Sequence, residues 1–191
     1  LVVDRRSAEM IKYAANSLLA TRISFMNEIA NVCERVDANV DKVRLGIGKD
    51  HRIGPHFLYA GIGFGGSCFP KDVKALARKG RQEGYDFQIL DAVLDVNDEQ
   101  RRRLATQAEG YFDGDLEGRR IAVWGLSFKP GTDDTREAPS HIIIDALLDQ
   151  GADVAGYDPE AIETTRETFG DRIEYGAGMY DVIDGAEALL I

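Results

Sequence analysis

The segment Gly61–Asp72, which reads GIGFGGSCFPKD, has the residue types for covalent chemistry at a cysteine. Four glycines within six positions allow positive φ angles and let a ligand approach the backbone closely. Pro70 suits the first turn of a helix, and the apolar residues after it recur at helical spacing. The sequence therefore predicts Cys68 at or just before a helix N-terminus, where free N–H groups and the helix dipole favour a reactive thiolate.

Two charged side chains follow this cysteine. Lys71 brings a positive charge within one turn, and Asp72 offers a carboxylate that can hold a water or accept a proton. The alternative is a glycine-rich connector with a small buried cysteine, which is the usual role of a lone cysteine. The glycine pair before Cys68, the proline after it and the Lys-Asp pair together favour the catalytic interpretation.

A long amphipathic helix is expected upstream, from Ser7 as its cap to about Val36. Lys12 and Asn16 are four residues apart and share one face of this helix, although such a pair taken alone is more typical of a solvated surface. Further helices are expected over 37–44, from Cys68 to about Gln82 and over 87–112, with a loop over 46–55.

The hydrophobic pattern changes its period near residue 119. Strands are expected over 121–126, 153–158 and 187–191, separated by helices over 139–150 and 159–169, which indicates a doubly wound parallel sheet. Lys129 and Arg136 fall beyond the carboxyl end of the first strand, where such sheets bind ligands, but the first turn lacks G-x-G-x-x-G. The sequence thus predicts an α-helical domain over 1–114 and a Rossmann-like α/β domain over 115–191, truncated within its last strand.

The composition argues against several classes of function. The 191 residues include 33 acidic and 23 basic ones, and a net charge of -10 is unsuited to a nucleic-acid surface. No apolar run approaches the length of a membrane span, and His51 and His56 lack partner ligands at metal spacing, so neither a membrane nor a metal is expected. Two cysteines, Cys33 and Cys68, are too few for a disulfide scaffold and indicate the cytoplasm.

Three ordered segments resemble the nucleotide-sugar dehydrogenases, also called the UDP-glucose/GDP-mannose dehydrogenase family, which oxidise a sugar alcohol to an acid. Residues 7–16 (SAEMIKYAAN) resemble the start of the family's central helical domain, and residues 63–72 (GFGGSCFPKD) resemble its nucleophile loop. Residues 125–140 (GLSFKPGTDDTREAPS) resemble the signature of its C-terminal nucleotide-binding domain. The similarity covers essentially the whole chain.

The resemblance implies a four-electron oxidation at C6 of UDP-glucose, with NAD⁺ as the hydride acceptor. Cys68 would attack the intermediate aldehyde, giving a thiohemiacetal and then a thioester that is hydrolysed to the uronate. Lys12 would stabilise the oxyanion, which needs a preorganised positive partner. Asn16 would orient the same water or oxygen, and Asp72 would serve in proton transfer or water activation.

The resemblance also assigns residues to binding. Those assigned to the UDP-sugar site are Phe57, Tyr59, Phe64, Gly65, Lys129 and Arg52. Of these, Lys129 would reach the nucleotide, and Arg52 would reach the substrate of a neighbouring subunit. Lys71 and Arg136 are assigned to NAD. The long helix over 87–112 would form the core of a homodimer.

Two parts of the family have no counterpart in the sequence: the N-terminal Rossmann domain with the cofactor fingerprint, and the end of the C-terminal domain. We therefore expect a fragment that does not turn over by itself and a full-length protein that does. Two alternatives stay open. One is a dehydrogenase of GDP-mannose or of a UDP-N-acetylhexosamine, although Ser67 and Lys71 resemble the hexose 6-dehydrogenases more. The other is a non-catalytic dimerisation and nucleotide-binding module.

Overall fold

The computed structural model describes residues 1–191, which pack into two compact units, Leu1–Gln100 and Arg101–Ile191. We call them unit 1 and unit 2. Unit 1 is helical, and unit 2 contains a parallel sheet with its helices, so the expected fold classes are confirmed. The division falls inside the helix α4 (Gln88–Tyr111), whereas the boundary predicted from the sequence lies after residue 114.

The longest helix, α1 (Arg5–Arg35), is capped by an aspartate. Asp4 accepts hydrogen bonds from Ser7 N at 3.1 Å and from Ser7 Oγ at 2.6 Å. The expectation that Ser7 caps this helix was wrong, because the charged Asp4 side chain reaches the free N–H of the first turn from three residues earlier. An N-cap of this kind stabilises a helix by about 1 kcal/mol.

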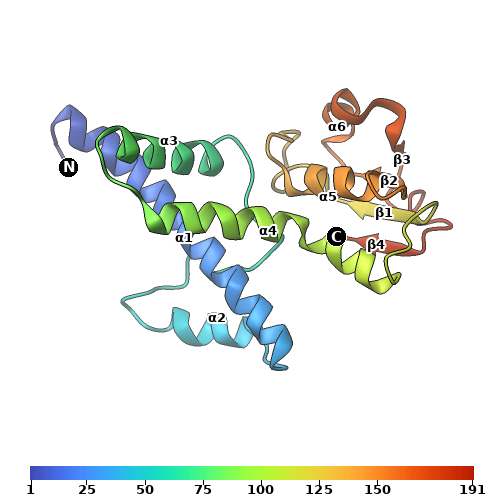
Figure 1. The fold of residues 1–191 in the computed structure, drawn as a ribbon, viewed down its shortest axis with the longest axis horizontal. Coiled ribbons are helices and arrows are strands. Elements are labelled where there is room, and N and C mark those ends of the chain that lie inside the picture. Colours follow the sequence, from blue (N-terminus) through green and yellow to red (C-terminus); the bar gives the residue numbers. More distant parts are fainter. The chain divides into compact units, whose positions relative to one another are not determined.

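One apolar cluster holds unit 1 together. The helix α3 (Phe69–Gln82) and the first part of α4 lie beside α1 (Figure 1). The buried members of the cluster come from these three helices and from the glycine-rich loop: Ala20, Phe64, Val73, Leu76, Ala77, Leu90 and Val93. Because burying one large apolar side chain contributes about 1.5–3 kcal/mol, the inclusion of Phe64 ties the loop to the core.

The short helix α2 (Val40–Gly48) lies later in the chain than the expected 37–44. Asn39 caps it by accepting a hydrogen bond from Lys42 N at 3.0 Å. Asp37 has a φ of 55°, a left-handed conformation that does not belong to a helix, so α1 and α2 are separated there.

Unit 2 is built on four parallel strands in the order β3-β2-β1-β4. They are β1 (Arg120–Trp124), β2 (Asp153–Tyr157), β3 (Glu174–Tyr175) and β4 (Ala188–Leu190). The helix α5 (Pro139–Leu148) connects β1 to β2, and α6 (Ile162–Phe169) with a 3₁₀ turn (Gly170–Arg172) connects β2 to β3. The central residues Ile121, Ala122 and Val123 are buried, as expected of a parallel strand covered on both faces.

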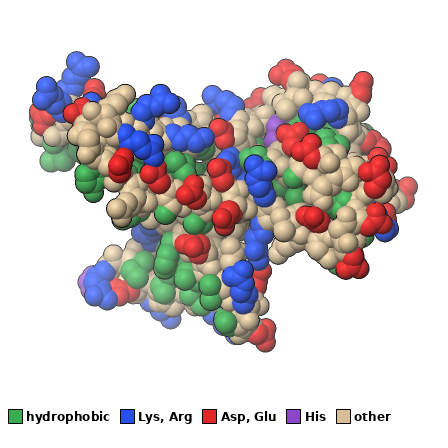
Figure 2. Space-filling model, viewed as in Figure 1, with side chains coloured by type: hydrophobic (Ala, Val, Ile, Leu, Met, Phe, Trp, Pro, Cys, Tyr) green, Lys and Arg blue, Asp and Glu red, His purple; other side chains and the backbone are tan.

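The helix α1 also exposes a stripe of apolar side chains. Ile11, Leu18, Phe25 and Val32 recur every seven residues and are each at least half exposed, so they share one face of the helix. Figure 2 shows further hydrophobic side chains gathered over α2. None of the helices combines the length and the apolar composition that crossing a membrane requires.

Candidate active site

Cys68 lies where the glycine-rich loop turns into α3. It occupies the N-cap position, its side chain caps nothing, and its carbonyl oxygen accepts the N–H of Asp72 at 2.8 Å. The thiol is exposed and lies 3.8 Å from Ser67 Oγ. Pro70 stands in the first turn, as the sequence predicts. The thiol is therefore next to the positive end of the helix dipole.

Asp72 is the centre of the charged group beside this cysteine. Its side chain is fully buried, and its Oδ2 accepts hydrogen bonds from Lys12 Nζ at 2.9 Å and from Asn16 Nδ2 at 2.6 Å. Its Oδ1 has no hydrogen-bond partner, and Lys71 Nζ lies 3.8 Å from it. The structure thus brings Lys12 and Asn16 on α1 to the carboxylate that lies one turn beyond Cys68.

The ionisation of this group follows from its contacts. Burial by itself raises the pKa of the Asp72 carboxyl, but the hydrogen bonds from Lys12 and Asn16 and the nearby charges lower it below its usual value. The hydrogen bond to Asp72 in turn raises the pKa of Lys12. At neutral pH the group is therefore an ammonium paired with a carboxylate.

This arrangement can stabilise negative charge beside a nucleophile. The Lys12 side chain is 58% exposed, so its ammonium can meet a ligand. The free Oδ1 of Asp72 offers an acceptor for a water molecule or a proton. A thiol, a fixed ammonium and a carboxylate are the components of covalent catalysis at a carbonyl.

Aromatic side chains surround the start of α3. The Phe69 ring meets the edges of Phe57 and Phe64, with ring centroids 6.2 Å and 5.9 Å apart. Phe64 and Gly65 are buried, whereas Phe57 is 40% exposed and has a φ of 57°, which is rare for an aromatic residue. A shallow hollow of about 450 Å³ opens here, lined by Pro55, His56, Phe57 and Tyr59.

Two residues assigned to the substrate have other partners in this chain. The Tyr59 ring lies under the Arg44 guanidinium, 4.3 Å from the ring centroid. Arg52 donates to the carboxylate of Asp50, with Nη2 at 2.6 Å and Nε at 3.0 Å. No hydrogen bond or ring contact joins Tyr59 or Arg52 to the group around Cys68.

Unit 2 places Lys129 and Arg136 on the loop that follows β1. Lys129 is exposed, and its Nζ lies 5.3 Å from the centroid of the Phe128 ring. Arg136 donates to Asp134 through Nε at 2.9 Å and Nη2 at 2.6 Å, and this contact lowers the pKa of Asp134 to about 2. Both residues lie at the carboxyl end of the sheet, where the sequence places them.

Asp158, which was not among the predicted site residues, binds several backbone groups at the same edge of the sheet. It follows β2 and is almost fully buried. Its Oδ2 accepts the N–H groups of Leu126 and Ser127 at 2.8 and 3.3 Å, and its Oδ1 accepts those of Glu160 and Ala161 at 2.8 and 2.9 Å. Burial raises the pKa of this carboxyl, but the four N–H groups lower it below its usual value.

These contacts decide whether unit 2 fits a dinucleotide such as NAD. A dinucleotide site of this fold uses a glycine-rich turn after the first strand and a free acidic side chain for the ribose. Here the turn reads Gly125-Leu126-Ser127, and both oxygens of Asp158 are occupied by backbone N–H groups. The residues of unit 2 therefore do not fit NAD.

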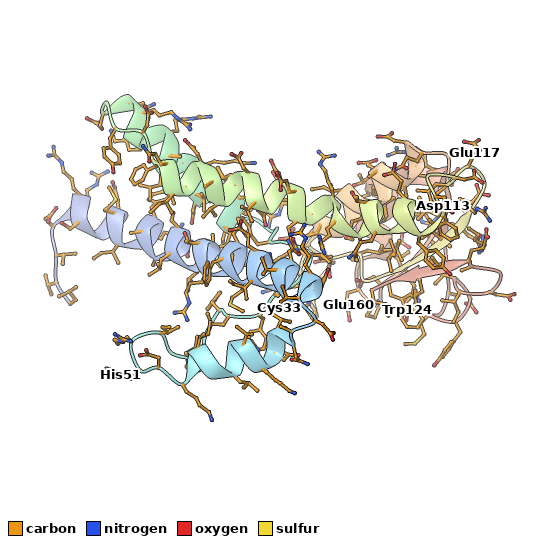
Figure 3. The ribbon with its side chains drawn as sticks, turned by 60° about the horizontal axis from the view of Figure 1, so that its bottom comes forward. Cys33, His51, Asp113, Glu117, Trp124 and Glu160 are labelled. Carbon is orange, nitrogen blue, oxygen red and sulfur yellow. The ribbon has the colours of Figure 1, made fainter.

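Three side-chain amides in unit 1 were also not among the predicted site residues. Asn27 on α1 and Asn97 and Gln100 on α4 are buried and bind the backbone of Gly61 and Phe64. A signal for them existed, since each amide interrupts an apolar stripe of a predicted helix. Cys33, near the C-terminal end of α1 (Figure 3), is buried as well.

Comparison with known proteins matches both units to one family. The model "UDP-glucose/GDP-mannose dehydrogenase family, central domain" matches residues 6–99, and the model for the family's "UDP binding domain" matches residues 122–191. The chain is 48% identical over its whole length to UDP-glucose 6-dehydrogenase of Pseudomonas aeruginosa, of which it covers 43%. It is 50% identical over 97% of its length to UDP-glucose 6-dehydrogenase TuaD of Bacillus subtilis, of which it covers 40%.

A solved structure is similar throughout. The UDP-glucose dehydrogenase of the hyperthermophilic archaeon Pyrobaculum islandicum superposes with a TM-score of 0.94 and 42% identity, over 99% of this chain and 44% of that one. The chain thus spans less than half the length of the relatives it matches. With two domain models matched in order over most of its residues, the chain belongs to the UDP-glucose/GDP-mannose dehydrogenase family.

Proposed function

We propose that the chain is the central and UDP-binding part of an NAD⁺-dependent UDP-glucose 6-dehydrogenase, which oxidises UDP-glucose to UDP-glucuronate. The observation that carries this proposal is the exposed Cys68 beside a buried Asp72 held by Lys12 and Asn16. The names and identities of the relatives support the substrate. The activity is proposed for a longer protein that contains this chain.

In the proposed mechanism Cys68 acts on the aldehyde formed at C6. Its sulfur adds to the carbonyl carbon, so that a C–S bond forms and the carbonyl oxygen takes negative charge in a thiohemiacetal. Lys12, with its exposed ammonium, stabilises this oxygen. Loss of a hydride from the same carbon leaves a thioester, and attack of water on the thioester releases the carboxylate and the free thiol.

Asp72 and Asn16 serve the hydrolytic step. The unpartnered Oδ1 of Asp72 can accept a proton from the attacking water, while Asn16 and Lys12 fix the other oxygen of the carboxylate. The two oxidations need a hydride acceptor, and we assign NAD⁺ to the remainder of the longer protein because unit 2 does not fit it. The contacts of Lys71 and Arg136 with this cofactor stay predictions.

The substrate would lie against the aromatic end of the cysteine loop. The hollow lined by Phe57 and Tyr59 supports this position, and the roles of Phe64 and Gly65 in binding stay predictions. Lys129 would meet the nucleotide, since it is an exposed cation at the carboxyl end of the sheet. Arg52 is proposed to reach the substrate of a neighbouring subunit. The cytoplasm is the proposed location, which two free cysteines suit.

A second copy of this chain is the proposed partner of unit 1. We expected the helix over 87–112 to form the dimer core, but Leu90, Val93, Ala105 and Ala108 of α4 are buried within the chain. The apolar stripe of α1, repeating every seven residues, is a better candidate, because such a seam packs against its own copy. Phe25→Asp should make a dimer monomeric in sedimentation experiments, while Ile89→Asp on α4 should not. A chain that is monomeric at high concentration would refute the dimer.

The function is tested with the longer protein, UDP-glucose and NAD⁺. We expect two NADH per UDP-glucuronate formed. Cys68→Ala should abolish this four-electron oxidation, whereas Cys33→Ala, which removes the buried thiol, should retain it. Full oxidation by Cys68→Ala would refute the mechanism. A higher kcat/KM for GDP-mannose or a UDP-N-acetylhexosamine would refute the assigned substrate.

A further inference from the structure

The loop that carries Cys68 has no backbone–backbone hydrogen bonds of its own over residues 61–67. Two of its residues are held by side-chain amides instead. Gly61 N donates to Asn27 Oδ1 at 2.8 Å, and Gly61 O accepts from Gln100 Nε2 at 2.7 Å. Phe64 N donates to Asn97 Oδ1 at 2.7 Å, and Phe64 O accepts from Asn97 Nδ2 at 3.0 Å.

Asn97 therefore replaces a whole peptide group of a neighbouring strand. Its side chain is only 2% exposed, and it satisfies both polar groups of Phe64 at once. Since Phe64 is also buried, water cannot easily replace this amide if it is removed. A substitution that removes the amide leaves a donor and an acceptor of the loop without partners.

The contact between Asn97 and Phe64 can affect the position of Cys68 because the two segments are close along the chain. Between Phe64 and Cys68 lie only two glycines and a serine, and a backbone rich in glycine has little stiffness of its own. The Phe64 ring meets Phe69, the residue after Cys68. With Phe64 fixed by Asn97, both sides of the cysteine are anchored to the same core.

We propose that Asn97 is a positioning residue for the Cys68 nucleophile, which it holds in register with Lys12 and Asp72 through Phe64. Asn97 does not touch the substrate in this scheme. The proposal rests on the proposed function of Cys68. A displacement of about 1 Å at a reacting group can lower the rate about a hundredfold, which makes the contact measurable in catalysis.

The chain offers a matched control for stability. Ser24 Oγ donates to the carbonyl of Val93 at 3.1 Å, a buried bond that joins α1 to α4 and does not touch the loop. Ser24→Ala therefore removes a hydrogen bond from the same core. A purely structural role of Asn97 predicts that both substitutions impair catalysis in proportion to their loss of thermal stability.

Asn97→Leu and Asn97→Asp are compared with Ser24→Ala in the longer protein. We expect Asn97→Leu to lower kcat about 10–100-fold with KM for UDP-glucose changed less than threefold, and Ser24→Ala to change kcat less than twofold. A protonated aspartic acid can donate and accept as the amide does, whereas its carboxylate repels the Phe64 carbonyl. The kcat of Asn97→Asp relative to wild type should therefore rise as the pH falls from 8 to 5.5.

Alkylation of the cysteines by iodoacetamide gives a readout that does not need catalysis. Modification of Cys68 should slow at least threefold in Asn97→Leu and not in Ser24→Ala, with buried Cys33 as the internal reference. Equal effects of Asn97→Leu and Ser24→Ala, or a pH profile of Asn97→Asp parallel to wild type, would overturn the proposal. If the wild-type protein oxidises no nucleotide sugar, the proposed function fails, and the alkylation rates alone decide the role of Asn97.

Discussion

The carboxylate of Asp158 should stabilise unit 2 more than any exposed ion pair of the chain. Asp158→Asn keeps the size of the side chain but leaves one oxygen to serve four N–H groups, and its NH₂ faces N–H groups that need acceptors. Two of these N–H groups, those of Leu126 and Ala161, belong to buried residues. Leaving a buried donor unpaired costs about 1–3 kcal/mol, so we expect a loss of about 2–4 kcal/mol.

Trp124 provides the assay. It is the single tryptophan of the chain and lies in β1, so its fluorescence during urea denaturation reports on unit 2. Glu167→Gln, at an exposed position on α6, is the matched control and should change the free energy of unfolding by less than about 0.5 kcal/mol. A loss below about 1 kcal/mol for Asp158→Asn at pH 7 would contradict the reasoning.

The pH dependence gives a second check of the same substitution. The folded-state pKa of Asp158 lies below the 3.8 of a free side chain. Its carboxylate therefore contributes stability that is fully present above the unfolded pKa and is lost as the pH falls through the lower, folded value. The difference between wild type and Asp158→Asn should stay constant above about pH 4 and shrink below it. A difference that does not shrink would assign the effect to packing.

Two further predictions use other contacts. Gly80→Ala would place a Cβ 2.7 Å from both Tyr85 O and the Phe87 ring, so it should destabilise unit 1 by about 1–3 kcal/mol in thermal unfolding. A Cβ added at Gly110 on α4 would meet no other atom, so Gly110→Ala should stabilise its helix by up to about 1 kcal/mol in the same assay. Arg136→Met should raise the pKa of Asp134 from about 2 towards the usual 3.8, which carbon-detected NMR titration measures; an unchanged value would show that Arg136 is not the cause.

Local patterns predicted most of the fold. The long periodic stretches predicted α1, α3 and α4, and the apolar run at 121–126 predicted β1. Each of these elements shows its hydrophobic pattern over several consecutive residues. β3 was not predicted because a strand of two residues is too short to show a period. The start of α2 depended on which of several polar residues caps it, and Asn39 does.

The site was predicted only where its members are neighbours along the chain. Cys68 and Asp72 are one turn apart, and so are Lys12 and Asn16. No local sequence pattern predicts that the two pairs meet, and only the family resemblance implied this contact. The amide that holds Phe64 is 33 residues away from it and was not predicted. Contacts of this kind are set by the packing of helices, which a single sequence does not specify.

The helix α1 also sets the spacing between two contacts of the site. Asn16, which holds Asp72, and Asn27, which holds Gly61, are eleven residues apart, close to three full turns, so both point to one side. One residue inserted between them would turn one amide by about 100° and shift it by about 1.5 Å relative to the other. The length of this stretch is therefore constrained more tightly than its composition: an alanine inserted after Ala20 should slow Cys68 alkylation, whereas one inserted after Asp37 should not.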